Sequence, residues 1–265
     1  MDCQNTIKNL KINKNKNIGE VVIVVEGQSF EFNLLKHIFT NILDYNYIPF
    51  KRGKKEPDKF VSKSNKNSTV VVINTSSSNI KSIFEDQNYK DKIYEFLKSK
   101  YNKKLTNTQI YFIWDRDRDS NDSEIIKKGL TTFKSALDND FEMNGLLLLS
   151  YPCVESFVLS NFNKNLWRKM FKNSKDAKTN LSDLPKISNS KINENTLLVA
   201  AENMHRTFKK IGINNYDTSN FKNYNLNIFA YEEDTYKERK KYYALSLVCI
   251  MLIDLGIITE KSLFA

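Results

Sequence analysis

The sequence has few of the residues from which zinc sites, disulfide frameworks and membrane spans are built. Its 265 residues include three cysteines and two histidines. The cysteines are odd in number, distant from one another and absent from any C-x-x-C pair. This argues against a structural zinc site and indicates a reducing, cytoplasmic location. The longest apolar stretch, residues 243–253, is interrupted by a serine and is too short to cross a bilayer.

Two signals for targeting and for nucleotide binding are missing as well. Residues 1–16 are polar and rich in lysine, and they lack the apolar segment of a signal peptide. We therefore expect no membrane partner. No glycine–lysine motif of the Walker A type is present in the sequence, so any ATPase that acts with this chain would be a separate protein.

What the chain has in excess is positive charge. It carries 41 lysines and arginines against 31 acidic residues, a net charge of +10, and apolar residues make up 40% of it. The apolar share and the length are sufficient for a globular core. The charge favours a polyanionic partner such as nucleic acid, because basic side chains release counterions from phosphates. Lysine, asparagine and isoleucine are all abundant, so compositional drift explains part of the charge equally well.

The first 150 residues alternate between the patterns of buried strands and of helices. Such alternation indicates the α/β class, with a mostly parallel sheet of about four strands flanked by helices. Continuous apolar runs predict strands at residues 21–25, 69–73, 109–114 and 146–149, with a further strand at 47–50. Apolar residues at helical spacing predict helices over residues 30–43, 80–100 and 123–137.

After residue 150 the pattern becomes mostly helical. Helices are expected over residues 154–161, 166–171, 196–211 and 235–255, and the apolar stretch 243–255 should pack in the interior or against another subunit. Residues 51–67 and 173–195 are expected to be loops or linkers. The predicted organisation is a flexible basic leader (1–18), an α/β domain (19–160) with an insertion around 51–105, and a mostly helical C-terminal lobe (161–265).

Acidic residues follow the ends of three expected strands. Glu26 comes after strand 21–25, Asp115 after strand 109–114, and Glu155 a few residues after strand 146–149. Ligands of parallel sheets bind beyond the carboxyl ends of the strands, so we expect these carboxylates to share a cleft. Each also has an ordinary interpretation. Glu26 can simply end a strand. Glu155 and Glu31 can each be an ordinary acid in the first turn of a helix, where the helix dipole favours a carboxylate.

The segment after strand 109–114 reads Asp-Arg-Asp-Arg-Asp. In an extended chain Asp115, Asp117 and Asp119 lie on one face, where their repulsion favours a hard cation such as Mg²⁺. A solvated acidic turn balanced by Arg116 and Arg118 is the alternative. An EF-hand loop is rejected, since the sixth and twelfth positions counted from Asp115 are neither glycine nor glutamate.

These residues together resemble a known family. Segments 22–27 and 112–117, with Glu-Gly after a first strand and Asp-x-Asp after a later one, resemble the TOPRIM domain. Topoisomerases, primases, OLD-family nucleases and the ribonuclease that matures 5S ribosomal RNA share this domain. Glu31, Asp119 and segment 151–155 are similar to OLD-like and related bacterial anti-phage TOPRIM proteins. The resemblance covers roughly residues 20–160.

The resemblance implies a TOPRIM-like fold and a Mg²⁺- or Mn²⁺-dependent endonuclease that cleaves DNA or RNA, with tRNA among the candidate substrates. It further implies a toxic effector of an anti-phage, abortive-infection system. The expected partners are a separate ATPase sensor chain and further copies of the same chain. The catalytic residues would be Glu26, Asp115 and Asp117. The implied metal ligands are Glu26, Glu31, Asp115, Asp117, Asp119 and Glu155, which could hold one metal or two.

The chain also departs from the family. The spacing between Glu26 and Asp115 is long, and arginines stand beside Asp117 where the family has small residues. The sequence has neither a zinc ribbon nor an identifiable tyrosine-nucleophile domain, which argues against a primase and a topoisomerase. Two other functions stay open. One is a catalytically silent nucleic-acid-binding or regulatory subunit of a defence complex, and the other is a primase-like nucleotidyl transferase.

Two further groups of residues have alternative interpretations. The basic residues of segment 51–59, with a phenylalanine at either edge, could contact phosphates or belong to a solvated loop. The aromatic-rich segment 216–231 could stack on bases or pack in a core.

Overall fold

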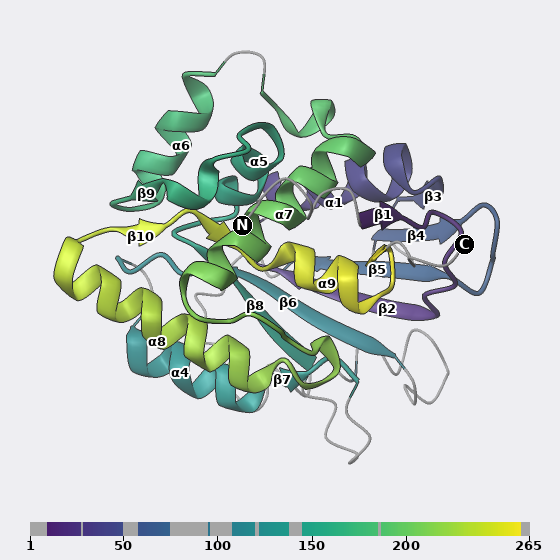
Figure 1. Ribbon diagram of the computed structural model, residues 1–265. Coiled ribbons are helices and arrows are strands. Elements are labelled where there is room, and N and C mark those ends of the chain that lie inside the picture. The colour runs from purple at the N-terminus through teal and green to yellow at the C-terminus, as the bar shows by residue number, and fades with distance from the viewer. Residues whose placement is uncertain are drawn as a thin grey trace.

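The computed structural model describes residues 10–27, 29–49, 58–74, 95, 108–119, 122–137, 145–184 and 187–260. These residues form a central mixed sheet flanked by helices (Figure 1). The expected α/β class is therefore confirmed. The strands, in order across the sheet, are β11 (Leu245–Ser246), β8 (Gly145–Tyr151), β6 (Gln109–Asp115), β2 (Glu20–Val25), β5 (Thr69–Asn74), β4 (Asp58–Ser62) and β3 (Tyr45–Ile48), and β7 (Lys134–Ser135) pairs with β8.

Four neighbouring strands, β8, β6, β2 and β5, run parallel, as the sequence predicts. Residues 21–25 of β2 are all buried, because a central parallel strand is covered on both faces. In the register of the sheet, Val24 lies opposite Ile73 of β5 and Phe112 of β6, and Asp115 lies opposite Ser150 of β8. The carboxyl ends of β2, β6 and β8 therefore come to the same edge.

The helices agree in part with the sequence expectations. Those expected near residues 30–43, 123–137, 154–161 and 196–211 are present, although β7 takes the end of the second. The helix expected over 80–100 lies outside the described residues apart from residue 95. The helices are α1 (Phe30–His37), continued by a π-helical turn at Ile38–Ile42, α4 (Ser123–Thr132), α5 (Glu155–Phe162), α6 (Ser174–Ser182), α7 (Glu194–Lys210), α8 (Lys222–Arg239) and α9 (Val248–Asp254), with 3₁₀ turns at Leu166–Arg168, Asn189–Lys191 and Thr218–Asn220. In the described part of the chain, every helix is too short or too polar to span a bilayer.

Strand β4 corrects the loop expected over residues 51–67. It is antiparallel to β3 on one side and to β5 on the other. Its central residue, Phe60, is fully buried and stacks on Phe39 with 5.7 Å between ring centroids. Charged residues such as Asp58 and Lys59 are common near the edge of a sheet, where part of each strand is solvated. The polar composition of this segment thus belongs to a partly exposed strand, the second from the edge of the sheet. Residues 51–57 of the expected basic patch lie outside the described residues.

Helix α6 corrects the linker expected over residues 173–195. The Asn173 side chain caps its N-terminus by accepting a hydrogen bond from the Asp176 amide at 3.1 Å. Ala177 is the helix's fully buried residue, and most of the remaining residues face solvent. The polar composition therefore reflects a short capped helix with a narrow apolar stripe.

The prediction of a single helix over residues 235–255 is wrong. Helix α8 ends at Arg239, and Lys240 takes the left-handed conformation with φ of 56°. The chain then forms β10 (Tyr242–Tyr243), β11 and α9. β10 pairs with β9 (Met170–Phe171), which also replaces part of the helix expected over 166–171. The apolar stretch is buried as predicted, but it forms two short strands and a helix instead of one long helix.

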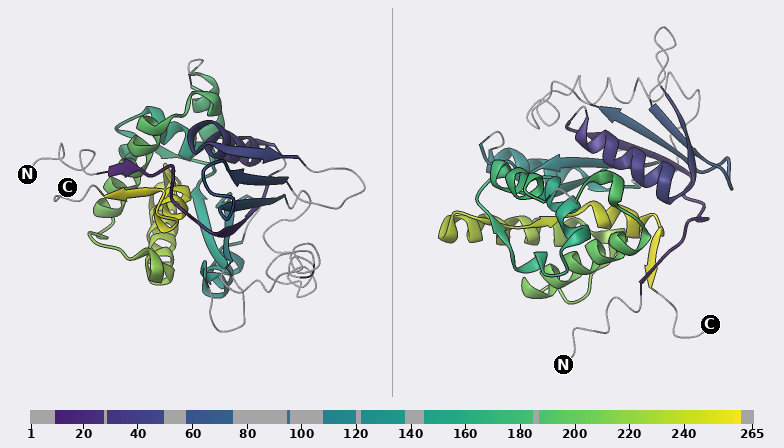
Figure 2. Two further views of the ribbon diagram at one scale, coloured as in Figure 1. Left: turned by 90° about the vertical axis from the view of Figure 1, so that its right-hand side faces the viewer. Right: turned by 90° about the horizontal axis from the view of Figure 1, so that it is seen from above.

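The first and last described strands lie side by side (Figure 2). β1 (Leu10–Ile12) pairs antiparallel with β12 (Ile258–Glu260), and both Leu10 and Ile258 are buried. Residues 10–12 are therefore part of the fold, which corrects the flexible leader expected for residues 1–18. Residues 1–9 lie outside the described residues.

One hydrophobic core runs through both halves of the chain. Helix α8 packs on α4, and its Asn225 side chain donates a hydrogen bond to the Leu147 carbonyl of β8 at 2.6 Å. Phe221 and Phe229, in the aromatic-rich segment, are buried, which favours their interpretation as core residues. The residues after 160, expected to form a C-terminal lobe, thus contribute to the same core as the sheet.

Candidate metal centre

Three carboxylates meet at the carboxyl ends of neighbouring strands. Glu26 follows β2, Asp115 is the last residue of β6, and Glu155 begins α5 after β8. Glu26 Oε2 accepts a hydrogen bond from the Asp115 amide at 3.1 Å, and Asp115 Oδ1 accepts one from the Val154 amide at 2.7 Å. These two bonds hold Asp115 between its neighbours. The acids that the sequence places at separate strand ends therefore lie together.

Glu31 reaches the same place from the first turn of α1. Its side chain is buried, and its charge interacts with those of Glu26 and Asp115. Gly27 makes room for it, because a Cβ atom at position 27 would lie 2.2 Å from Glu31 Oε2. Any side chain at this strand end would therefore displace the Glu31 carboxylate.

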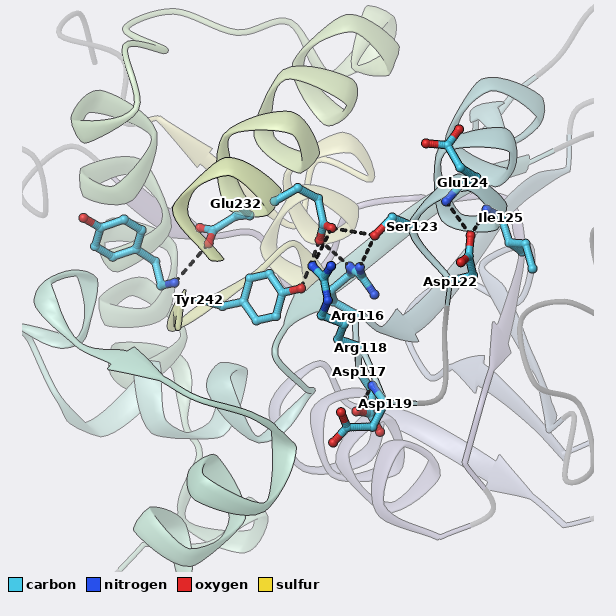
Figure 3. Close-up of polar contacts among 12 residues, drawn as sticks. Arg116, Asp117, Arg118, Asp119, Asp122, Ser123, Glu124, Ile125, Glu232 and Tyr242 are labelled. Atoms are coloured by element: carbon cyan, nitrogen blue, oxygen red, sulfur yellow. Dashed lines mark hydrogen bonds and ion pairs between the residues drawn. The ribbon is translucent and has the colours of Figure 1, made fainter. Parts of the chain in front are cut away.

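Asp117 belongs to this group, whereas Asp119 lies at its outer side. The charge of Asp117 interacts with that of Glu26, and its amide donates to the Pro152 carbonyl at 3.1 Å. β6 ends at Asp115, so the alternation of an extended chain does not continue to Asp119. The Asp119 side chain is exposed, and its amide donates to Asp117 Oδ1 at 3.4 Å (Figure 3). We use the term acidic cluster for Glu26, Glu31, Asp115, Asp117 and Glu155.

Burial and the charges of neighbouring carboxylates raise the pKa values of Glu26, Glu31 and Asp115. Burial raises the pKa of Glu26 to about 7, and the charges of Glu31 and Asp117 add to this effect. Burial also raises the pKa of Asp115 well above its ordinary value, and the charges of Glu26, Glu155 and Glu31 raise it further. A divalent cation would relieve this repulsion, because it stabilises the charged form of every carboxylate near it.

Glu155 carries a buried oxygen atom that is suited to a ligand. The residue is 6% exposed, and its Oε2 atom has no hydrogen-bond partner among the described residues. Leaving such an atom unpaired costs free energy. The other carboxylate oxygen lies 4.0 Å from Nζ of Lys178, whose side chain is 55% exposed. A cation at Oε2 would therefore satisfy an atom that the protein leaves without a partner.

Lys178 brings a positive charge to the acidic cluster from α6. Its pKa is raised: partial burial lowers it, but the charges of Glu155 and Asp115 outweigh that effect. Sequence reasoning missed this residue, because it lies in the segment that was expected to be a linker. No local pattern distinguishes it from the many other lysines of the chain.

Arg116 and Arg118 point toward α8, away from the side chains of Asp117 and Asp119 (Figure 3). Arg116 is fully buried, and its Nε lies 2.7 Å from Glu233 Oε1. Arg118 Nη1 lies 3.1 Å from Glu233 Oε2, and the hydroxyl groups of Ser123 and Tyr242 donate to the same carboxylate at 2.6 and 3.0 Å. We call these five residues the arginine–glutamate clamp. It attaches the segment after β6 to α8.

The clamp explains why arginines alternate with aspartates in segment 115–119. Asp115 and Asp117 belong to the acidic cluster, while Arg116 between them pairs with Glu233, 117 residues further along the chain. The interpretation of the arginines as counterions of a solvated turn therefore does not apply to Arg116. Sequence reasoning could not find Glu233, because only the tertiary fold brings α8 to this segment.

Comparison of the chain with protein-family models, with curated proteins and with solved structures gives no match. The chemistry of the candidate centre therefore rests on its own residues. Carboxylate oxygens are the ligands that Mg²⁺ and Mn²⁺ prefer. The unpartnered Glu155 oxygen and the mutual repulsion of the carboxylates fit a divalent cation at this edge of the sheet.

Proposed function

We propose that the chain is a metal-dependent nuclease of the TOPRIM type, which cleaves a nucleic acid at the acidic cluster. The observation that carries the proposal is the meeting of Glu26, Asp115 and Glu155 at the carboxyl edge of the parallel strands, with one Glu155 oxygen buried and unpartnered. The order of the motifs along the chain, Glu-Gly and then Asp-x-Asp, supports it. So does the net charge of +10, because the substrate is a polyanion.

The residues of the acidic cluster divide the work of cleavage. Asp115 and Glu155 would bind Mg²⁺ or Mn²⁺ directly, and Asp117 would bind it through a retained water. The metal would offset charge on the phosphate and lower the pKa of a water nucleophile. Glu26 accepts or donates a proton at its carboxylate, which the Asp115 amide holds in place. Lys178 is half-exposed beside the carboxylates and can contact a phosphate oxygen.

The biological setting follows from the resemblance to OLD-like TOPRIM proteins. We propose a toxic effector of anti-phage defence, held silent or triggered by a separate ATPase chain. The alternative is a catalytically silent nucleic-acid-binding subunit of such a complex. The presence of five neighbouring carboxylates in the acidic cluster favours the catalytic role, since a binding surface for a polyanion would gain nothing from clustered negative charge.

The test compares the purified chain with three variants on DNA and on RNA, in the presence of Mg²⁺ or Mn²⁺. Glu26→Ala should lower the cleavage rate by about 10²–10⁴, because it removes the proton-transfer group, and added metal should not restore it. Asp117→Asn keeps the side-chain size and removes one charge, so high metal concentrations should partly restore cleavage. Asp234→Asn, an exposed change on α8, should cleave like the wild type.

A partner that silences the isolated chain would hide this activity, so the same variants are also expressed in cells. The wild-type chain should be toxic and the Glu26→Ala chain harmless. Equal toxicity of the two, together with nucleic-acid binding and no cleavage by the reconstituted complex, would reject the nuclease and leave the binding subunit.

A further inference from the structure

Cys153 lies against the acidic cluster, in the turn between β8 and α5. Its side chain is fully buried. One ligand atom each from Cys153, Asp115 and Glu155 lies within 4.8 Å of the other two. Among the described residues, this is the one group of three acidic, histidine or cysteine side chains that meets such a distance. A thiol therefore lies among the candidate metal ligands, whereas the sequence motifs predict carboxylate ligands alone.

The spacing of the three side chains suits a small cation. Ligand atoms around one tetrahedral ion, with bonds of about 2.0–2.3 Å, lie about 3.6 Å apart. Side-chain movements of about an ångström would bring the three atoms to that distance from their present separations of up to 4.8 Å. The Cys153 thiol donates a long hydrogen bond to the Ser174 carbonyl at 3.8 Å and also interacts with the Glu155 side chain, so it already lies against one of the proposed ligands. Glu155 Oε2 is without a partner among the described residues.

The candidate site also has an entry path. A cavity of about 450 Å³ opens beside Glu155 and Lys178, between α1 and α6. Phe30 and Leu181 line it on the apolar side. Because the Lys178 side chain is 55% exposed, it can move out toward solvent when a cation approaches Glu155. A metal ion in this cavity can thus reach Glu155, whose ligand atom lies within 4.8 Å of that of Cys153.

We propose that Cys153 binds a transition-metal cation of the Zn²⁺ or Co²⁺ class together with Asp115 and Glu155, and that this centre prefers such a metal to Mg²⁺. The thiol loses its proton to solvent as the sulfur–metal bond forms. Thiolate is a soft ligand that Zn²⁺ and Co²⁺ accept readily, whereas Mg²⁺ takes oxygen ligands. The inference rests on the proposed function only in placing a cation at the acidic cluster, and it does not require cleavage.

The test titrates Co²⁺ into the full-length chain and follows the near-ultraviolet band of a cobalt–thiolate bond. All proteins carry Cys3→Ser, which removes a thiol outside the described residues. The band should appear in this background and in Cys249→Ser, the matched control, since Cys249 is buried in α9. It should be absent in Cys153→Ser. That variant should bind Co²⁺ and Zn²⁺ about tenfold or more weakly, with Mg²⁺ affinity changed by less than about threefold.

A second measurement does not depend on the folding of a variant. X-ray absorption of the Zn²⁺-loaded protein that carries Cys3→Ser should show one sulfur neighbour at about 2.3 Å. Binding of Co²⁺ and Zn²⁺ with an all-oxygen shell, and without the band, would overturn the proposal and leave the nuclease proposal intact. The band and the sulfur neighbour in a protein that never cleaves nucleic acid would support the metal centre and reject the nuclease.

Discussion

Gly27 and Glu31 are a pair of residues in which one makes space for the other. A Cβ at position 27 would lie 2.2 Å from Glu31 Oε2, which is the mobile end of a side chain. Gly27→Ala should therefore leave the melting temperature nearly unchanged but push the Glu31 carboxylate away from the acidic cluster. We expect the variant to bind divalent metal several-fold more weakly in calorimetric titrations.

A double-mutant cycle separates this effect from a general disturbance of the strand end. Glu31→Ala already removes the displaced carboxylate, so Gly27→Ala should add little to it, and the two changes should not be additive. Full additivity of the two losses in metal affinity would show that Gly27 acts on the site in some other way.

At the scale of single residues, the sequence identified the acids but not their neighbours. Glu26, Asp115 and Glu155 could be predicted to meet, because buried strands are readable as apolar runs and their carboxyl ends share an edge. Lys178 could not, since it lies in a segment without a diagnostic pattern and reaches the cluster only through the packing of α5 and α6. The sequence does single out segment 151–155, but for Glu155 and not for the thiol of Cys153.

The arginine–glutamate clamp makes two elements depend on each other. Glu233→Gln would leave the fully buried Arg116 without its counterion, so we expect a loss of about 3–5 kcal/mol in the free energy of unfolding by urea. Asp234→Asn, one residue further along α8, is the matched control. Asp234 pairs with Lys237 at the surface, and its loss should leave the free energy of unfolding nearly unchanged.

The clamp prediction also has a consequence at the metal centre. Because the clamp attaches the segment after β6 to α8, its loss should loosen Asp117 and weaken metal binding in the same variant. A Glu233→Gln protein with wild-type stability would contradict the assignment of a buried ion pair.

The elements that sequence patterns predict well are those covered on both sides. The four parallel strands were found because their apolar runs need no knowledge of the partner. β4 and α6 were missed, since a half-solvated outer strand and a polar capped helix share the composition of loops. The sequence predicts one helix over residues 235–255 because the apolar residues in its second half fill the interior whatever their local geometry. Only the pairing with β9 and β8 determines where the strands begin.

At the scale of the whole molecule, one buried acid makes stability depend on pH. Burial raises the pKa of Glu232 to about 8, and the charge of Glu233 adds to this. Its Oε2 accepts a hydrogen bond from the Tyr243 amide at 3.0 Å. The folded chain keeps a proton that the unfolded chain releases above a pH of about 4.5. Stability from this group is therefore lost as the pH rises from about 4.5 to about 8.

Glu232→Gln should remove this dependence, because the amide is neutral at every pH. Measured by urea unfolding, the advantage of the variant over the wild type should grow between pH 5 and pH 8 by roughly 1 kcal/mol per pH unit. Glu238→Gln, an exposed change on the same helix, should run parallel to the wild type. A constant difference between Glu232→Gln and the wild type would mean that Glu232 is charged in the folded chain.

The pairing of β1 with β12 determines how the fold would respond to force. The strands are antiparallel, with Leu10 opposite Glu260 and Ile12 opposite Ile258. A pull applied at residues 10 and 260 would therefore act at the same end of the ladder. The hydrogen bonds would open one after another, as in a zipper, instead of sharing the load as they do in shear. The two ends of the described chain would separate at low tension, while the parallel strands that carry the acidic cluster remained intact.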